Sequence, residues 1–190
     1  MRLLPIPPSE LSAEQKPLAN DIQYIVDHVI KGFVANRADG ALLGPFIPML
    51  HFPQYGAASV AFSTAIKKDS TLSNVLREIA ILVTGAHFRS HYEMYAHSIV
   101  AENEGLSPTK IATITAGLRP ADLTEDEAAV YDLTFALVKG GVIPNLLYKQ
   151  ALKTLGHKNL AELICTIGNY CLVSILLNTY DIPVPDQEIF

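Results

Sequence analysis

The chain has 190 residues, of which 49% are apolar and 17% charged, and its formal net charge is −5. This length suffices for one domain with a sizeable core. The negative charge argues against a nucleic-acid partner, because phosphate binding needs basic patches. The charged share is low for a monomer that must cover its whole surface with polar groups, so we expect a homo-oligomer that buries part of this surface.

Neither end of the chain predicts a membrane protein. The N-terminal stretch MRLLPIPPSEL is too short and too proline-rich for a signal peptide. Residues 160–180 form the longest apolar run, but they contain Glu162, Asn169 and Asn178, and such groups are costly in lipid. We therefore expect a helix that is buried or lies at a subunit interface, and no membrane partner.

The two cysteines, Cys165 and Cys171, lie in the same apolar run, six residues apart. On a helix this spacing places them on nearly opposite faces, and it matches neither a disulfide nor a metal motif. We expect two buried free thiols. Free thiols are typical of a reducing compartment, so the expected location is cytoplasmic.

Helical start and stop signals run through the chain, and no segment shows convincing β-alternation. Thr124 with Glu127 has the spacing of a capping box, and Ser107-Pro108 reads as a helix start. Arg37 to Pro53 is rich in Gly and Pro and is expected to be irregular. The pattern predicts one all-α domain over residues 1–190 with about eight helices. The expected helices start at Ser9 or Ser12 and run to about 36, then cover 54–67, 74–88, 90–104, 108–117, 128–139, 144–155 and 160–178.

A carboxylate interrupts the most apolar of these helices. Residues 74–88 are apolar on nearly every face, which is typical of a helix inside the protein, and Glu78 lies in the middle. A buried carboxylate is unfavourable unless it is paired or protonated. Arg77 cannot face it, because adjacent residues on a helix point apart. We expect Glu78 to have a partner on another helix, in either a structural ion pair or a catalytic or supporting role.

A second concentration of polar side chains follows in residues 87–97. Glu93 and His97 are four residues apart and therefore share one helix face. A carboxylate beside an imidazole raises the pKa of the histidine and orients its ring, so the pair can hold and deliver a proton near neutral pH. The same spacing also occurs in exposed pairs that contribute only about 0.3–0.5 kcal/mol, so the spacing alone leaves both interpretations open.

Histidines elsewhere raise a metal alternative. His87 and His91 are also four apart, as in many zinc helices, but His91 and Glu93 are two apart and so point to nearly opposite faces. Only a helix break near Arg89 could bring the two pairs together. No HExxH motif is present, and we predict no metal. His51 follows the Gly-Pro-rich stretch and could line a pocket if that loop folds over the helices.

Several short motifs in a characteristic order carry a family resemblance over residues 40–185. The chain resembles the carboxymuconolactone decarboxylase family, within the alkylhydroperoxidase D-like superfamily. The resemblance implies an antiparallel helical bundle, assembly as trimers or hexamers, no cofactor, and catalytic positions at Glu93 and His97 with Glu78 in support. The motifs are GALLGPF at 40–46, LREIAIL at 76–82, HYE at 91–93 with His97, GLSP at 105–108, DEAAVY at 126–131 and NTYDIPVP at 178–185.

The thiol peroxidase branch of that superfamily shows the pattern E-x11-C-x-H-C-x3-H. On this chain Glu78 and His97 take the outer positions, but Ser90 and Glu93 stand where the two cysteines would be. Peroxide reduction in that branch needs a thiolate that attacks the peroxide and a second thiol that closes a disulfide. Serine and glutamate cannot do this, so we predict that the chain is not a thiol peroxidase.

The resemblance instead implies a cofactor-independent lyase acting on a small lactone or cyclic carboxylate. A conjugated lactone carbonyl can accept the electrons left by departing CO2, and the protein must then stabilise an oxyanion and protonate carbon. Hydrolysis, dehydration or isomerisation on the same fold, or a non-catalytic binding role, remain alternatives. The residues predicted to bind substrate are Arg77, Arg89, His51, His91 and Tyr92.

Overall fold

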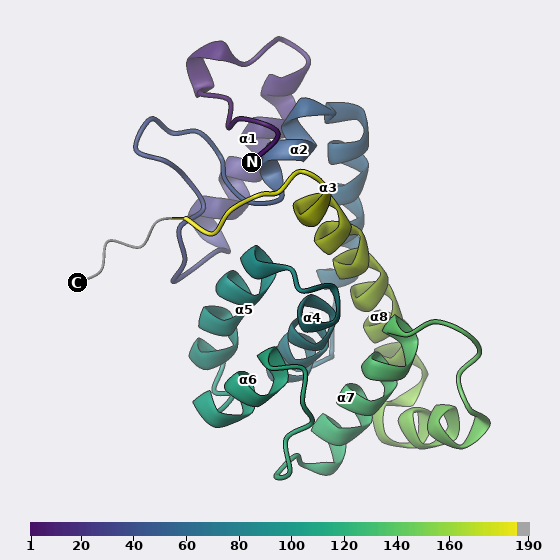
Figure 1. Cartoon of the computed structure of the whole chain (residues 1–190). Helices are drawn as coiled ribbons and strands as arrows, with labels where there is room; N and C mark the ends of the chain where they lie inside the picture. The colour runs from purple at the N-terminus through teal and green to yellow at the C-terminus, as the bar shows by residue number, and fades with distance from the viewer. Residues whose placement is uncertain (186–190) are drawn as a thin grey trace.

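The computed structural model describes residues 1–185, and in that range the chain is all-α, as expected (Figure 1). A short 3₁₀ turn at Pro8–Glu10 precedes the helices. The eight α-helices are α1 (Gln15–His28), α2 (Phe46–His51), α3 (Pro53–Lys67), α4 (Asn74–Phe88), α5 (His91–Asn103), α6 (Pro108–Thr115), α7 (Glu125–Val138) and α8 (Asn145–Thr179).

Helix α4 lies at the centre of the bundle and packs against α5, α6, α7 and α8 (Figure 1). Its residues 77–85 are all buried, which confirms the expectation of an interior helix. Ser73 caps its first turn by accepting a hydrogen bond from the Leu76 amide. The largest core cluster is formed by α4 with α6, α7 and α8, and includes Ile79, Leu82 and Leu163.

The N-terminal helices α1, α2 and α3 form the other end of the molecule, where α8 also ends (Figure 1). Hydrogen bonds join the chain start to the end of α8: the Arg2 amide donates to the Tyr180 carbonyl at 2.8 Å. The terminal ammonium of Met1 lies 2.8 Å from Asp181. A second core cluster beneath α2 contains Ile47, Tyr92 and Val173, and thereby connects this end to α5 and α8.

Two boundaries near the N-terminus differ from the sequence expectation. Helix α1 ends at His28 and not near residue 36. The chain passes so close to α5 at Gly32 that a Cβ there would lie 2.8 Å from the Asn103 side chain, and Gly32 has a φ of +92°. A residue with this φ cannot belong to a continuing α-helix. In addition, the stretch expected to be irregular contains α2.

Helix α8 combines two expected helices. Gly156 has a φ of 72° and a ψ of 170°, so the two helical segments meet at a break there. By length and composition α8 could cross a membrane, but the core helices of soluble proteins can have the same length and composition. It packs against α3, α4 and α7.

The expectation of two buried thiols was wrong, since Cys165 is exposed and Cys171 half-buried. Leu163, Thr166 and Ile167 occupy the buried face instead.

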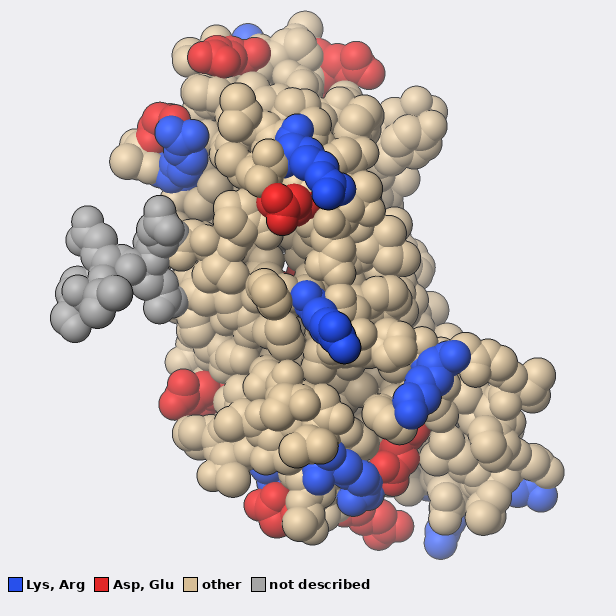
Figure 2. Space-filling model, in the orientation of Figure 1, with Lys and Arg blue, Asp and Glu red and all other residues tan. Residues whose placement is uncertain are grey.

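The outer faces of α3 and α8 remain apolar. Figure 2 shows few charged side chains along the edge that these two helices form. On α8 the exposed residues Ile164, Leu172 and Ile175 recur at helical spacing, and on α3 Tyr55 and Phe62 are exposed. An apolar stripe of this kind on a helix marks a surface that another apolar surface can cover.

Candidate active site

Helices α4 and α5 bring Glu78, Glu93 and His97 into one buried cluster. Nδ1 of His97 donates to Oε2 of Glu78 over 2.7 Å, and its Nε2 lies 3.5 Å from Oε2 of Glu93. Residue exposure is 5% for Glu78 and 4% for Glu93. Both relevant expectations are confirmed: Glu78 has its partner on another helix, and Glu93 shares a helix face with His97. The imidazole therefore has a carboxylate at each nitrogen.

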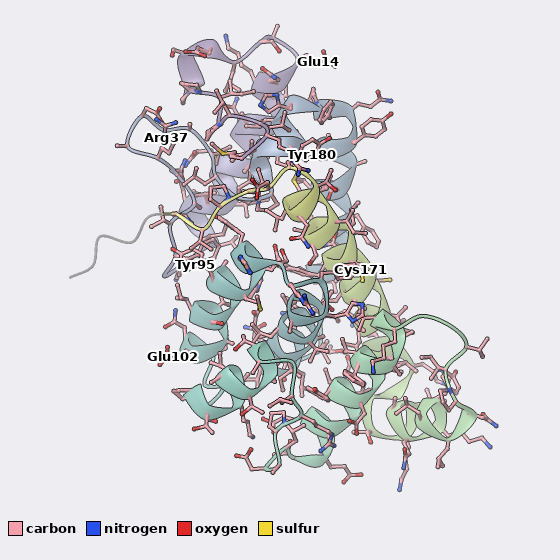
Figure 3. The ribbon with its side chains drawn as sticks, in the orientation of Figure 1. Glu14, Arg37, Tyr95, Glu102, Cys171 and Tyr180 are labelled. Atoms are coloured by element: carbon pink, nitrogen blue, oxygen red, sulfur yellow. The ribbon has the colours of Figure 1, made fainter. Side chains whose placement is uncertain are left out.

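The connection between the two helices sets this geometry. Arg89 ends α4 in the left-handed conformation, with a φ of 51°, and α5 begins two residues later. Gly85 allows the helices to approach closely, because a Cβ there would lie only 3.3 Å from Cβ of Glu93. A Cβ at 85 would require Glu93 to shift by a few tenths of an ångström. Figure 3 shows α4 between α5, which carries Tyr95, and α8, which carries Cys171.

Ser90 and Glu93 have the spacing of a capping box, but the box does not form. The Ser90 side chain makes no cap hydrogen bond, and its amide donates to the Gly85 carbonyl instead. Neither Oγ of Ser90 nor Oε2 of Glu93 has a hydrogen-bond partner in the part of the chain that the structure describes. At the start of α7, by contrast, Thr124 and Glu127 close the same box with both hydrogen bonds. Residues that give up a local stabilising arrangement are typical of functional sites.

The two helix starts are expected to respond differently to alanine. We expect Thr124→Ala to lower the free energy of unfolding by about 1–2 kcal/mol, because it removes a formed cap. We expect Ser90→Ala to change it by less than about 0.5 kcal/mol or to raise it, because it removes a buried hydroxyl without a partner. Urea unfolding of both variants measures the difference. An equal loss in both would mean that Ser90 caps α5 after all.

Burial and mutual charge shift the proton affinities of the cluster. Burial, opposed by the charge of His97 and reinforced by that of Glu78, raises the pKa of Glu93 to about 7. Burial lowers the pKa of His97, but the charge and hydrogen bond of Glu78 outweigh it, and the net pKa is raised. A neutral carboxylic acid and a protonated imidazole are thus both accessible near neutral pH, which is the range in which general acids are most effective.

A small cavity of about 40 Å³ lies beside this cluster. The Tyr170 ring belongs to both, since it lines the cavity and also meets the His97 ring edge-on with centroids 5.0 Å apart. Burial, with the charges of Glu93 and Glu78, raises the pKa of the Tyr170 phenol, which therefore stays protonated. The residues that line the cavity are Ser63, Ile66, Lys67, Arg77, Thr166, Asn169 and Tyr170.

Two cationic side chains face this cavity. Arg77 donates to Glu162 at 2.9 Å in a buried ion pair, whereas its Nε has no partner within residues 1–185. Loss of hydration lowers the pKa of the Lys67 amine, with Glu78 opposing the shift and Arg77 reinforcing it. A buried ion pair alone is weak evidence for function. The amine of Lys67 nevertheless offers a donor to a carboxylate at this position, whereas Nε of Arg77 is buried.

The structure places the other residues predicted to bind substrate away from the cluster. The Tyr92 hydroxyl donates to the Val34 carbonyl at 3.2 Å, and its ring is buried beneath α2. Nε2 of His51 lies 2.9 Å from the carbonyl oxygen of Leu4. The break at Arg89 does not bring His87 and His91 to Glu93. Arg89 and His91 line a different cavity, together with His87. In residues 1–185 no three His, Cys, Asp or Glu side chains form a potential metal site.

Sequence reasoning missed Lys67 and Tyr170. Lys67 is the last residue of α3 and resembles any helix-terminal lysine, so the sequence held no signal for it. Tyr170 and Asn169 interrupt the apolar run of α8. Polar groups that are kept in a buried helix need partners, and this could have marked them as facing a polar cluster.

Comparison with solved structures shows the fold. A peroxidase-related alkylhydroperoxidase D core protein from Ralstonia eutropha superposes with a TM-score of 0.73, at 16% identity, over 90% of this chain and 86% of that one. The debrominase Bmp8, solved as a cysteine-to-alanine variant in complex with 2,3,4-tribromopyrrole, gives 0.73 at 11% identity over 97% and 91%. A protein of unknown function from Agrobacterium tumefaciens gives 0.60 at 14% identity over 71% and 93%.

No protein-family model matches the chain, and no curated protein matches it by sequence. At these low identities the likeness establishes the alkylhydroperoxidase D-like fold and leaves the reaction to be argued from the site. The chain is therefore an all-helical protein of this fold. Its buried cluster contains two carboxyl groups and an imidazole.

Proposed function

We propose that this protein is an acid–base enzyme that acts on a small lactone or cyclic carboxylic acid, most simply as a decarboxylase. The observation that carries the proposal is His97, held between Glu78 at 2.7 Å and Glu93 at 3.5 Å in a buried site. An imidazole oriented by one carboxylate and adjacent to a second, protonatable carboxyl group is suited to general acid–base catalysis.

In the proposed reaction the substrate carboxylate lies near Lys67. The bond to the carboxylate carbon breaks, CO2 leaves, and the electron pair moves into the conjugated carbonyl to give a dienolate. A proton from His97 or Glu93 then adds to carbon, so that one proton replaces the lost CO2. Electrons need no external acceptor, because the carbonyl of the substrate takes them and returns them.

The neighbouring structures support a small cyclic substrate without defining it. The debrominase of the same fold was solved with a brominated pyrrole, which is a small ring. The peroxidase-related neighbour does not lead us to propose a thiol mechanism for this chain. The two cysteines of this chain lie on α8, whereas Ser90 and Glu93 stand at the turn from α4 to α5. A thiol mechanism at that turn lacks its nucleophile.

The test is a panel of carboxylated unsaturated lactones and β-keto acids, followed for CO2 release and for loss of substrate. CO2 formation with at least one member supports the decarboxylase. Turnover without CO2 would favour the alternative hydrolase, dehydratase or isomerase on the same cluster. Saturable binding without turnover of any member would favour a binding protein and contradict the enzyme.

The apolar α3/α8 edge supports a second part of the proposal, a homo-oligomer. Ile164, Leu172 and Ile175 on α8 are each more than two-fifths exposed, and the surface there carries few charges (Figure 2). Closed symmetric assemblies bury apolar patches of this kind. A monomeric mass in light scattering would contradict this assembly.

A further inference from the structure

A larger cavity lies on other faces of α4 and α5. It has a volume of about 440 Å³ and is bordered by α4, α5, α6 and α7. His87 is nine residues from Glu78 on α4, which at 100° per residue places the two on opposite faces. His91 is likewise nearly opposite Glu93 on α5. This cavity is therefore separate from the acid–base cluster, and a ligand bound in it would not depend on the proposed function.

The walls of this cavity combine an apolar floor with a basic rim. Tyr131 and Phe135 stack on one side with ring centroids 6.0 Å apart, and Val83, Met94 and Ile114 add apolar surface. His87, Arg89 and His91 stand at the rim, and no Asp or Glu is among the lining residues. No ion pair within residues 1–185 involves any of these three side chains. The charge of Arg89 is thus not neutralised by any described residue.

Arg89 occupies this rim at a conformational cost. It ends α4 with a φ of 51°, a position that glycine normally takes. The left-handed conformation places an arginine side chain where most helices have no side chain. An unfavourable backbone conformation retained by a long cationic residue is an observation from which a functional role can be inferred.

We propose that this cavity binds a small aromatic carboxylate. The guanidinium of Arg89 can donate two parallel hydrogen bonds to a carboxylate, as lysine cannot. His87 and His91 flank that position from the two neighbouring helices. The ring of the ligand lies against the apolar side chains of Met94 and Phe135, which line the cavity. The volume is within the usual range for small-molecule sites.

Benzoate is the probe, and benzyl alcohol is its uncharged match. Titration into ¹⁵N-labelled protein should give saturable amide shifts in residues 87–94 and 114–117 with benzoate. We expect benzyl alcohol to bind at least about tenfold more weakly, because it lacks the charge-assisted hydrogen bonds. Equal affinity for both compounds, or no saturable shift with benzoate at millimolar concentration, would overturn the proposal. Shifts confined to residues around Lys67 and Tyr170 would also overturn it.

The substitution Arg89→Gly separates binding from folding. Glycine suits a φ of 51°, so the variant should be at least as stable as the parent. It should nevertheless lose about tenfold or more in benzoate affinity, since the charged donor is gone. Arg37→Ala is the matched control, because Arg37 is an exposed arginine paired with Asp39 and lies outside the cavity. Unchanged benzoate affinity in Arg89→Gly would refute the assignment.

Discussion

Replacing His97 with alanine is expected to lower turnover of whichever panel substrate releases CO2 by about 10²–10⁴-fold, the usual contribution of a general acid or base. The substitution removes the imidazole between Glu78 and Glu93 and leaves two buried carboxyl groups without it. Like charges so close together favour a proton on one of them. The variant is therefore expected to remain folded but to lose the proton donor that Glu78 orients. Steady-state kinetics measures the effect, with circular dichroism to establish folding.

His157→Ala is the control for the His97 variant. His157 is an exposed histidine next to the break in α8, and its loss should leave turnover unchanged. Glu78→Gln should reduce kcat as well, because the amide can stabilise the wrong tautomer of the ring and cannot favour its charged form. If the alanine variant at 97 is folded and retains full kcat, His97 has no part in the reaction and the proposed mechanism is wrong.

The second large effect is the pH dependence of stability caused by Glu93. Its pKa is about 7 in the folded protein, against an ordinary value of 4.5. Below about pH 4.5 both folded and unfolded states are protonated. As pH rises from there to about 7, the unfolded state releases its proton first, so the free energy of unfolding falls. The full loss, on the order of 3 kcal/mol, is present above pH 7.

Glu93→Gln should remove this loss. We expect the variant to match the parent near pH 4.5 and to be more stable at pH 8 by up to about 3 kcal/mol, since the amide is never charged. A residual decline remains, because the raised pKa of His97 gives stability that is complete below pH 6.5 and lost as pH rises through that raised value. Urea unfolding at several pH values measures both effects.

Glu127→Gln is the control of opposite sign. Burial raises the pKa of Glu127, but hydrogen bonds from Lys110 and Thr124 outweigh it, and the net pKa is lowered. Its charge therefore stabilises the fold above pH 4.5 and ceases to do so as pH falls through the lowered value. The glutamine variant should be less stable than the parent at pH 8. A Glu93→Gln variant that also loses stability at pH 8 would show that the Glu93 charge is stabilised in the fold.

Local patterns were sufficient where the cause of structure is local. The apolar run of 74–88 predicted an interior helix, and the structure confirms it. The capping box at Thr124 formed as expected, because its two hydrogen bonds join residues three positions apart. The same pattern at Ser90 did not form. There the Ser90 amide donates to the carbonyl of Gly85 at the end of α4. That acceptor lies outside the four-residue capping-box pattern.

Helical spacing alone placed Glu93 and His97 on one helix face. The cost of burying a carboxylate alone required a distant partner for Glu78. The identity of that partner, the turn of Arg77 towards Glu162 and the meeting of Lys67 with Tyr170 depend on how α3, α4, α5 and α8 pack. These contacts join residues far apart in sequence. They are selected by shape and burial in three dimensions, about which one-dimensional spacing carries no information.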